Sequence, residues 1–328
     1  MRRVAVPLDL TPDAARPRDG RDVALSGPTM GVTWTVRARA PDSLGDGALR
    51  TAVQDACDRV VAQMSHWEPD SDLSRFNRAP AGSWIPLPEE FEAVISAALE
   101  VAEATGGAFD PTLGRLTDLW GFGPAGPIDR PPPVLALNGP RTGWCALRLE
   151  AGRLLQPGGA ALDLSGIAKG YGVDLVARAL AALGVRDYLV EIGGELRGSG
   201  VKGDGQPWWV ELERPPDASL GDPPLLVALH GLSVATSGDW RRSFVADGRR
   251  YSHTLDPAAR SPVSGATAAV TVLHPECHRA DALCTALMVL GPEAGAFAEA
   301  HDVAALILTR TREGYAEVLT PALERLLA

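Results

Sequence analysis

The segment Arg279–Gly291 reads RADALCTALMVLG, a run of small and apolar residues that is typical of a helix buried in a protein core. Before it, residues 270–273 form an apolar run that predicts a strand. After it, residues 304–319 predict a hairpin that turns at residues 313–314. A strand, a helix and then a hairpin depart from the regular alternation of strands and parallel crossovers. This stretch therefore favours an α+β fold over a doubly wound parallel sheet.

The rest of the chain shows the same mixture of helices and hairpins. Apolar periodicity predicts helices over residues 49–64, 88–105 and 166–184, strands over residues 32–38, 188–192, 208–213 and 225–229, and a hairpin turning at residues 247–248. Residues 123–143 are rich in proline and glycine and predict an irregular excursion. We expect a flexible tail over residues 1–20 and one domain over residues 21–328, with mixed or antiparallel sheets, packed helices and room for two intertwined subdomains.

Composition limits the classes of function. The chain has 328 residues, a net charge of -10 and a pI near 5.1, which argue against nucleic acid or an anionic membrane as the main partner. Its cysteines, Cys57, Cys145, Cys277 and Cys284, lack metal-ligand spacing and predict buried thiols. We expect no transmembrane segment, because no apolar run approaches the length of a membrane span. The first twenty residues show neither a secretory signal nor a lipobox cysteine, so a cytoplasmic location is expected for the sequence as written.

Two oxygen-bearing side chains stand out in the apolar helix. Asp281 and Thr285 are four residues apart and lie on one helical face. A carboxylate and a hydroxyl in apolar surroundings can give Mg²⁺ two oxygens and leave its other positions to water and phosphate, which suggests phosphate chemistry. Alternatively, Asp281 only favours the helix N-terminus and Thr285 only bonds back to a carbonyl of its own helix.

A second chemical signal is LDLSGIAKGY, residues 162–171. It places an acid, Asp163, at a strand end and a turn of small residues at a helix N-terminus, where free N–H groups favour phosphate. Lys169 lies in the first turn of that helix and is one of two lysines in a chain that otherwise uses arginine. The spacing of a Walker loop is absent, so the segment does not predict a P-loop nucleotide hydrolase.

Three further segments carry candidate ligand contacts. GPTMG, residues 27–31, brings a flexible backbone and a thioether that suit a flat ring, and residues 107–123 add a turn carboxylate and aromatic residues among glycines. Ordinary turns and core packing are the alternatives for these two. RYSHTLDP, residues 250–257, flanks His253 with hydroxyls and an acid, which predicts a proton-transferring histidine, although a structural role is also open.

Taken in order, these segments resemble the FAD:protein FMN transferase family, the ApbE-like flavin transferases. The resemblance runs from about Gly27 to Gly295. It rests on the ordered motifs GPTMG, MSHWEPDSDLSRFN, GAFDPTLGRLTDLWGFGP, LDLSGIAKGYGVD, YLVEIGGELRGSG, ATSGDWRRSF, RYSHTLDP and ADALCTALMVLG.

The resemblance implies an ApbE-like fold and an enzyme that binds FAD and Mg²⁺. Such an enzyme moves FMN onto a Thr or Ser hydroxyl of an acceptor flavoprotein and releases AMP. By similarity, the residues that line the FAD site are Met30, Trp67, Ala108, Phe109, Asp110, Asp163, Lys169 and Leu255. Asp281 and Thr285 hold the metal with an oxygen of the Ser165–Gly166 turn. In the reaction that this implies, His253 accepts the proton of the hydroxyl because its ordinary pKa lies near working pH, and Asp256 orients it.

Two other functions stay open at this point. In one, water replaces the protein acceptor and the chain is an Mg²⁺-dependent FAD pyrophosphatase that gives FMN and AMP. In the other, it is a non-catalytic FAD carrier, which has no need of a metal at the pyrophosphate. The sequence also departs from the family pattern. Trp67 stands where tyrosine is common, residues 123–143 lack the usual helical pattern, and the family is often periplasmic or lipid-anchored.

Overall fold

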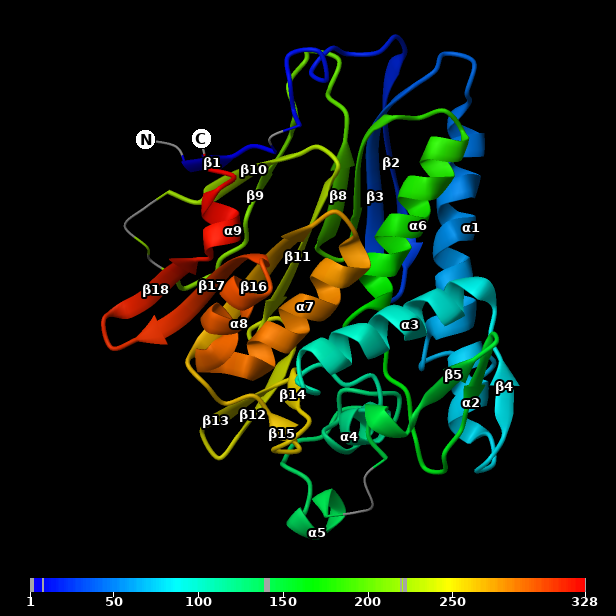
Figure 1. Cartoon of the computed structure of the whole chain (residues 1–328), viewed down its shortest axis with the longest axis vertical. Helices are drawn as coiled ribbons and strands as arrows, with labels where there is room; N and C mark the ends of the chain where they lie inside the picture. The colour runs from blue at the N-terminus through cyan, green and yellow to red at the C-terminus, as the bar shows by residue number, and fades with distance from the viewer. Residues whose placement is uncertain (1–2, 8, 139–141, 219, 221–222, 328) are drawn as a thin grey trace.

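An antiparallel eight-stranded sheet lies at the centre of the protein, in the strand order β18-β17-β16-β11-β8-β7-β3-β2 (Figure 1). The structure is a computed structural model that describes residues 3–7, 9–138, 142–218, 220 and 223–327. The strands of this sheet are β2 (Arg21–Thr29), β3 (Val32–Ala40), β7 (Asp187–Ile192), β8 (Glu195–Ser199), β11 (Leu232–Gly238), β16 (Thr267–His274), β17 (Ala304–Thr311) and β18 (Gly314–Leu319). Together with packed helices this arrangement confirms the α+β prediction.

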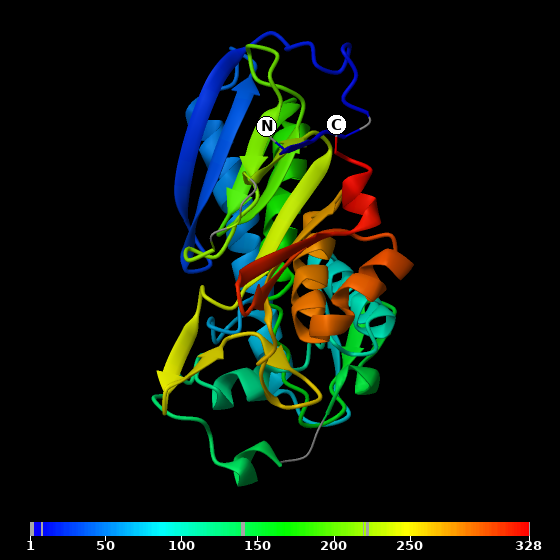
Figure 2. The same ribbon diagram turned by 90° about the vertical axis from the view of Figure 1, so that its left-hand side faces the viewer.

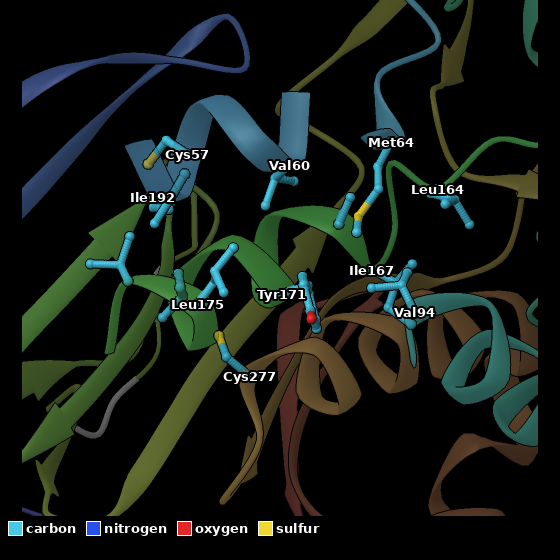
Figure 3. Packing of buried hydrophobic residues seen from close by; sticks show 14 of the residues in the cluster. Cys57, Val60, Met64, Val94, Leu164, Ile167, Tyr171, Leu175, Ile192 and Cys277 are labelled. Atoms are coloured by element: carbon cyan, nitrogen blue, oxygen red, sulfur yellow. The ribbon is translucent and has the colours of Figure 1, made fainter. Parts of the chain in front are cut away.

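One face of the sheet is covered by three long helices, α1 (Asp46–Met64), α6 (Ala168–Ala182) and α7 (Cys277–Leu290), and α3 (Glu89–Ala104) packs against α7. α1 lies against β2, α6 against β7 and β8, and α7 against β11 and β16, while α6 also contacts both α1 and α7. Figure 3 shows where they meet, with Met64, Val94 and Tyr171 from three helices in one cluster. The amphipathic periodicity that predicts these helices is the pattern that buries their apolar faces here.

The alternation of side chains along β16 explains how a second layer forms. Val270 and Val272 face the core beneath α7, whereas Ala269 and Leu273 belong to a separate core on the other face. That second core is covered by a three-stranded sheet of β1 (Arg3–Ala5), β10 (Leu225–Leu229) and β9 (Trp208–Glu211).

The prediction of a flexible tail over residues 1–20 is wrong for residues 3–5. Arg3–Ala5 pairs in parallel with β10, Ala5 is fully buried, and Arg3 forms an ion pair with Glu317. A strand of three residues is too short to show a period, so its pairing depends on partners that are distant in the sequence.

A lobe at the end of the molecule opposite the two termini carries the remaining chemistry (Figures 1 and 2). It contains α4 (Gly114–Leu119), α5 (Val134–Leu137), the hairpin of β12 (Ser243–Ala246) and β13 (Arg249–Ser252), and the short pair β14 (Leu255–Asp256) and β15 (Ser261–Pro262). Its small core joins Leu116, Trp120, Phe122 and Leu255. The excursion over residues 123–143 is irregular apart from α5, and residues 139–141 lie outside the described residues.

Short elements complete the chain. They are α2 (Asp72–Arg78), the sheet of β4 (Trp84–Pro86), β6 (Arg153–Leu155) and β5 (Arg148–Glu150), α8 (Ala294–Ala300), α9 (Pro321–Glu324), and 3-10 turns at Trp144–Ala146 and Gly291–Glu293. The stretch Cys277–Ala300 is long and apolar enough to cross a membrane, with a mean hydropathy of 1.2. Ala280, Cys284 and Leu287 within it are fully buried against the sheet, as in the core helix of a globular domain.

A buried carboxylate fixes α7 against α6. Asp174 of α6 accepts the backbone N–H groups of Cys277 and His278, each at 3.1 Å, and therefore satisfies donors at the start of α7 that have no partner within the helix. The same carboxylate binds the ring of His278 at 2.8 Å and the guanidinium of Arg197. These contacts set the register between α6, which carries Lys169, and α7, which carries Asp281.

We expect Asp174→Ala to lower the free energy of unfolding by about 3–5 kcal/mol, because it leaves the half-buried Arg197 and the buried N–H groups of Cys277 and His278 without their partner carboxylate. Urea denaturation followed by circular dichroism measures this. The matched change Asp46→Ala breaks a solvent-exposed pair with Arg21 and is expected to cost about 1 kcal/mol or less. Equal losses in the two variants would show that Asp174 is not a structural anchor.

Candidate active site

A cavity of about 200 Å³ lies between the start of α6, the face of α7, β11 and the lobe. Ten of the residues predicted from the sequence line it: Ala108, Phe109, Asp110, Asp163, Gly166, Lys169, His253, Leu255, Asp281 and Thr285. They come from segments that are far apart in the chain. The fold therefore gathers a carboxylate and hydroxyl pair, a lysine, a histidine and an aromatic residue around one space.

Asp281 and Thr285 of α7 face this cavity together with Gly166. Asp281 is 4% exposed, and its Oδ2 accepts the N–H of Gly170 at 3.0 Å. The Thr285 hydroxyl donates to the carbonyl of Asp281 at 3.4 Å. The bond back to its own helix, which the sequence left open as an alternative, is therefore also present. A Cβ on Gly166 would lie 2.8 Å from that hydroxyl oxygen, so a glycine is needed for the turn to approach α7 this closely.

Two buried carboxylates share one ammonium at the base of the cavity. Lys169 forms an ion pair with Glu195, and Asp281 acts on the same ammonium. Although burial opposes it, these two acids hold the pKa of Lys169 above its usual value. Burial raises the pKa of Glu195 to about 7 and also raises the pKa of Asp281. When both acids are ionised, the group carries one negative charge in excess of its ammonium, in surroundings that disfavour charge.

This charge and donor set fit Mg²⁺. A divalent cation would offset the excess negative charge, and Asp281, Thr285 and the backbone at Gly166 offer the oxygen ligands that it prefers. Glu195 Oε2 is buried and has no hydrogen-bond partner within the protein, as expected for an oxygen that faces a ligand site. No cluster of three His, Cys, Asp or Glu side chains suited to a metal occurs among the residues that the structure describes. A site with one carboxylate, one hydroxyl and one backbone oxygen has no need of such a cluster.

Asp163 is held rigidly beside the start of α6. Its carboxylate accepts the N–H of Ser165 at 2.9 Å and the hydroxyl of Thr117 at 2.7 Å, and His66 Nδ1 lies 3.4 Å away. Burial alone would raise its pKa, but His66 and these hydrogen bonds hold the pKa of Asp163 below its usual range. Asp110 likewise accepts the N–H of Thr112 at 2.8 Å. Both acids fix the turns that shape the cavity.

His253 presents one ring nitrogen as a base. Its Nδ1 lies 3.2 Å from the carbonyl oxygen of Arg242. A carbonyl oxygen only accepts, so Nδ1 carries the hydrogen and Nε2 keeps a free lone pair. Burial, with the cations Arg242, Lys169 and Arg241 nearby, lowers the pKa of His253 to about 4. The expectation of an ordinary histidine pKa is therefore wrong for the ligand-free protein, because the half-buried ring lies among cations.

Three predicted residues do not line this cavity. Met30 packs toward α6, where its methyl group lies 3.0 Å from the position a Cβ would take on Gly172. Trp67 is 52% exposed and tilts against His66, with the ring centroids 5.5 Å apart. Asp256 Oδ1 accepts backbone N–H groups of its own turn, at 2.7 Å from Ala258 and 3.0 Å from Ala259. Flavin contact by Met30 and Trp67 and the orienting role of Asp256 stay predictions.

Sequence reasoning missed three charged residues of the cavity. Glu195, Arg241 and Arg242 all line it. Arg241 donates to the carbonyl of Gly193 at 3.2 Å, and Arg242 to that of Phe122 at 3.2 Å. A signal was available, because Glu195 is a charged residue that directly follows the two glycines of the motif YLVEIGGELRGSG.

The raised acid pKa values predict how Mg²⁺ and pH act on stability. A carboxyl with a folded pKa above its unfolded value contributes stability that is complete below the unfolded value, 4.5 for Glu195, and lost as pH rises through about 7. We expect Mg²⁺ to raise the melting temperature more at pH 8 than at pH 5, because only the ionised group needs the cation. Scanning calorimetry with ionic strength matched by NaCl tests this. Equal Mg²⁺ shifts at both pH values would contradict a cation site beside these acids.

Comparisons with known proteins agree with this geometry. The family model described as ApbE family matches residues 30–307. The FAD:protein FMN transferase of Vibrio cholerae serotype O1 is 37% identical over 316 residues, covering 95% of this chain and 94% of that protein. The enzyme of the same name from Haemophilus influenzae is 34% identical and covers 98% and 96%.

Solved structures give the same result. The apo crystal structure of Pseudomonas stutzeri flavinyl transferase ApbE has a TM-score of 0.86 and 41% identity, covering 93% of this chain and 96% of that one. The flavin transferase ApbE from Vibrio cholerae has a TM-score of 0.86 and 36% identity, covering 94% and 99%.

Proposed function

This chain belongs to the ApbE family and is a transferase enzyme, and we propose that it moves FMN from FAD to a Thr or Ser hydroxyl of an acceptor flavoprotein and releases AMP. The observation that supports this most is the single cavity that joins Asp281, Thr285 and Lys169 to His253. The first three suit a metal-bound pyrophosphate, and the histidine suits a hydroxyl nucleophile. A carrier that only stores FAD has no use for both.

The chain's own residues divide the work of the reaction. Asp281, Thr285 and the backbone at Gly166 would hold Mg²⁺, which when bound neutralises charge on the pyrophosphate and on departing AMP. Lys169 places an ammonium against the same phosphates. α6 begins at Ala168, just after the cavity-lining residues Ser165 and Gly166, and the positive end of its dipole favours an anion there.

His253 acts on the acceptor. Its Nε2 takes the hydroxyl proton while the hydroxyl oxygen bonds to the phosphorus of the FMN moiety, and the bond between that phosphorus and the AMP oxygen breaks. Nδ1–H remains bonded to the carbonyl of Arg242, which keeps the ring oriented. The anionic pyrophosphate of bound FAD offsets Arg241, Arg242 and Lys169, so we expect the pKa of His253 to rise toward neutrality in the complex.

One experiment tests the proposal. The purified protein is incubated with FAD, Mg²⁺ and a peptide or domain that carries an acceptor threonine, with a Thr→Val peptide as the matched control. Mass spectrometry of the peptide and chromatography of the nucleotides give the result. We expect FMN bound to the threonine peptide alone, with one AMP released per adduct. Free FMN and AMP without an adduct would indicate a pyrophosphatase, and intact FAD would indicate a carrier.

A further inference from the structure

Glu195 occupies a fixed position in the middle of the central sheet. It is the first residue of β8, which lies between β7 and β11, and it follows the Gly193–Gly194 turn, where both glycines have positive φ. Its side chain is 3% exposed and lines the same cavity as Asp281. The carboxylate is therefore held by the sheet and has little freedom to turn away.

The two oxygens of this carboxylate have different surroundings. Oε1 contacts the ammonium of Lys169, whereas Oε2 is buried without a hydrogen-bond partner. A carboxylate that served only as a structural counter-ion would be expected to have both oxygens satisfied by the protein. An unsatisfied buried oxygen on a cavity-lining residue instead points to a donor that arrives with the ligand.

We infer that Glu195 is a positioning residue for FAD. Oε1 holds the Lys169 ammonium against the pyrophosphate, and Oε2 accepts a hydrogen bond from an O–H group of the bound ligand, either a hydroxyl of FAD or a water on its metal ion. This rests on the proposed function, because it assumes that FAD occupies the cavity. In this role Glu195 acts mainly through Lys169 and not on the reacting phosphorus.

Without the carboxylate, the lysine is free to move. A flexible ammonium in a cavity adopts several rotamers, and ordering it on FAD binding then opposes affinity. The neighbouring acid, Asp281, would also attract it, and would draw it toward the position that the metal needs. Loss of Glu195 should therefore weaken FAD binding more than it slows the transfer step.

A double-mutant cycle tests this. The Kd for FAD is measured by the quenching of flavin fluorescence, with Mg²⁺ present and acceptor absent. Glu195→Gln keeps the shape of the side chain but removes the charge, and we expect it to raise the Kd for FAD about tenfold. In a Lys169→Met background, the same change is expected to raise the Kd by about threefold or less, because only the contribution of Oε2 remains. Equal factors in the two backgrounds, or normal affinity in Glu195→Gln, would overturn the inference.

Further variants separate positioning from a general effect on folding. Glu195→Asp keeps the charge but shortens the side chain, and we expect a Kd for FAD between those of the parent and Glu195→Gln. Glu317→Gln alters another buried acid, paired with Arg3 and Arg214 away from the cavity, and should leave the Kd unchanged. A matching rise in Glu317→Gln would identify a folding effect and overturn the assignment.

Steady-state kinetics provide an independent test of the positioning role. We expect Glu195→Gln to raise the KM for FAD while kcat falls less than threefold. A fall in kcat with unchanged KM would assign Glu195 to the chemical step and overturn the positioning role. Because FAD affinity is measured without acceptor, failure of FMN transfer in the parent would overturn the proposed function alone.

Discussion

Asp281→Asn should lower FMN transfer by well over tenfold at low Mg²⁺, a loss of more than about 1.4 kcal/mol of transition-state stabilisation. Asparagine keeps the size and one oxygen, so it can still accept the N–H of Gly170 that Asp281 Oδ2 accepts at 3.0 Å. It removes the charge that attracts the cation. Steady-state rates over a range of Mg²⁺ concentrations test this, and excess Mg²⁺ is expected to restore part of the activity.

The same substitution should not destabilise the metal-free protein. Burial raises the pKa of Asp281, which means that the folded state disfavours its charged form. Removing that charge relieves the excess of carboxylates over the Lys169 ammonium. We therefore expect an unchanged or higher melting temperature without Mg²⁺, together with loss of most stabilisation by Mg²⁺. Activity and stability would then change in opposite directions, which damage to folding cannot produce.

A buried acid outside the cavity provides the control. Asp187 is 1% exposed and pairs with Arg18, and it does not line the cavity. Asp187→Asn should lower the melting temperature while the rate per folded molecule stays within about threefold. Thr285→Val should act in the same direction as Asp281→Asn but more weakly, because a neutral ligand gives the cation less. Near-normal turnover of Asp281→Asn at low Mg²⁺ would remove Asp281 from the metal site.

Local periodicity was enough to predict the long helices but not the full sheet. α1, α3, α6 and α7 each bury one face of a repeating pattern, so their existence follows from neighbouring residues alone. β2, β8 and β11 contain glycine, proline or small polar residues that weaken any strand signal. β8 also depends on close approach to the second layer, as at Gly198, where a Cβ would lie 2.5 Å from the Cβ of Leu229 in β10.

The candidate site likewise has one part that local sequence predicts and one part that it does not. Ordered motifs were sufficient to single out Asp281, Thr285 and Lys169, which line one cavity, because each motif is a local arrangement. The partner of Lys169 was not predicted, since Glu195 lies on a strand whose register with α6 is set by tertiary packing. The carbonyl that orients His253 belongs to a residue eleven positions away across a hairpin. Contacts of this kind decide the pKa and tautomer of a residue, and no local pattern encodes them.

His253→Asn is expected to lose FMN transfer by a factor of roughly 10²–10⁴, the usual contribution of general base catalysis. Asparagine can still donate to the carbonyl of Arg242, so the hairpin backbone should keep its shape. FAD affinity should stay within about threefold of the parent, because neither the metal ligands nor Lys169 depend on the imidazole. Rates at saturating FAD and acceptor, with Kd values for FAD measured separately, test both expectations.

His274 offers a control because burial lowers its pKa as well, while it does not line the cavity. Its Nδ1 accepts the N–H of Glu276 at 2.9 Å. His274→Asn should transfer FMN at the parental rate. A loss in both variants would point to a general effect of removing a half-buried imidazole.

The pH dependence distinguishes a base from a structural residue at His253. In the free enzyme its pKa is lowered to about 4, so the neutral imidazole is present at all working pH values and its titration appears in kcat/KM only near that acid limit. In the FAD complex we expect a higher pKa, and kcat should then fall with decreasing pH on the acid side of neutrality. That acid limb should be absent from the residual FAD hydrolysis of His253→Asn, which we expect to continue slowly. If His253→Asn transfers FMN as fast as the parent and keeps the limb, the proton leaves through another group, and Asp256 becomes the next residue to change.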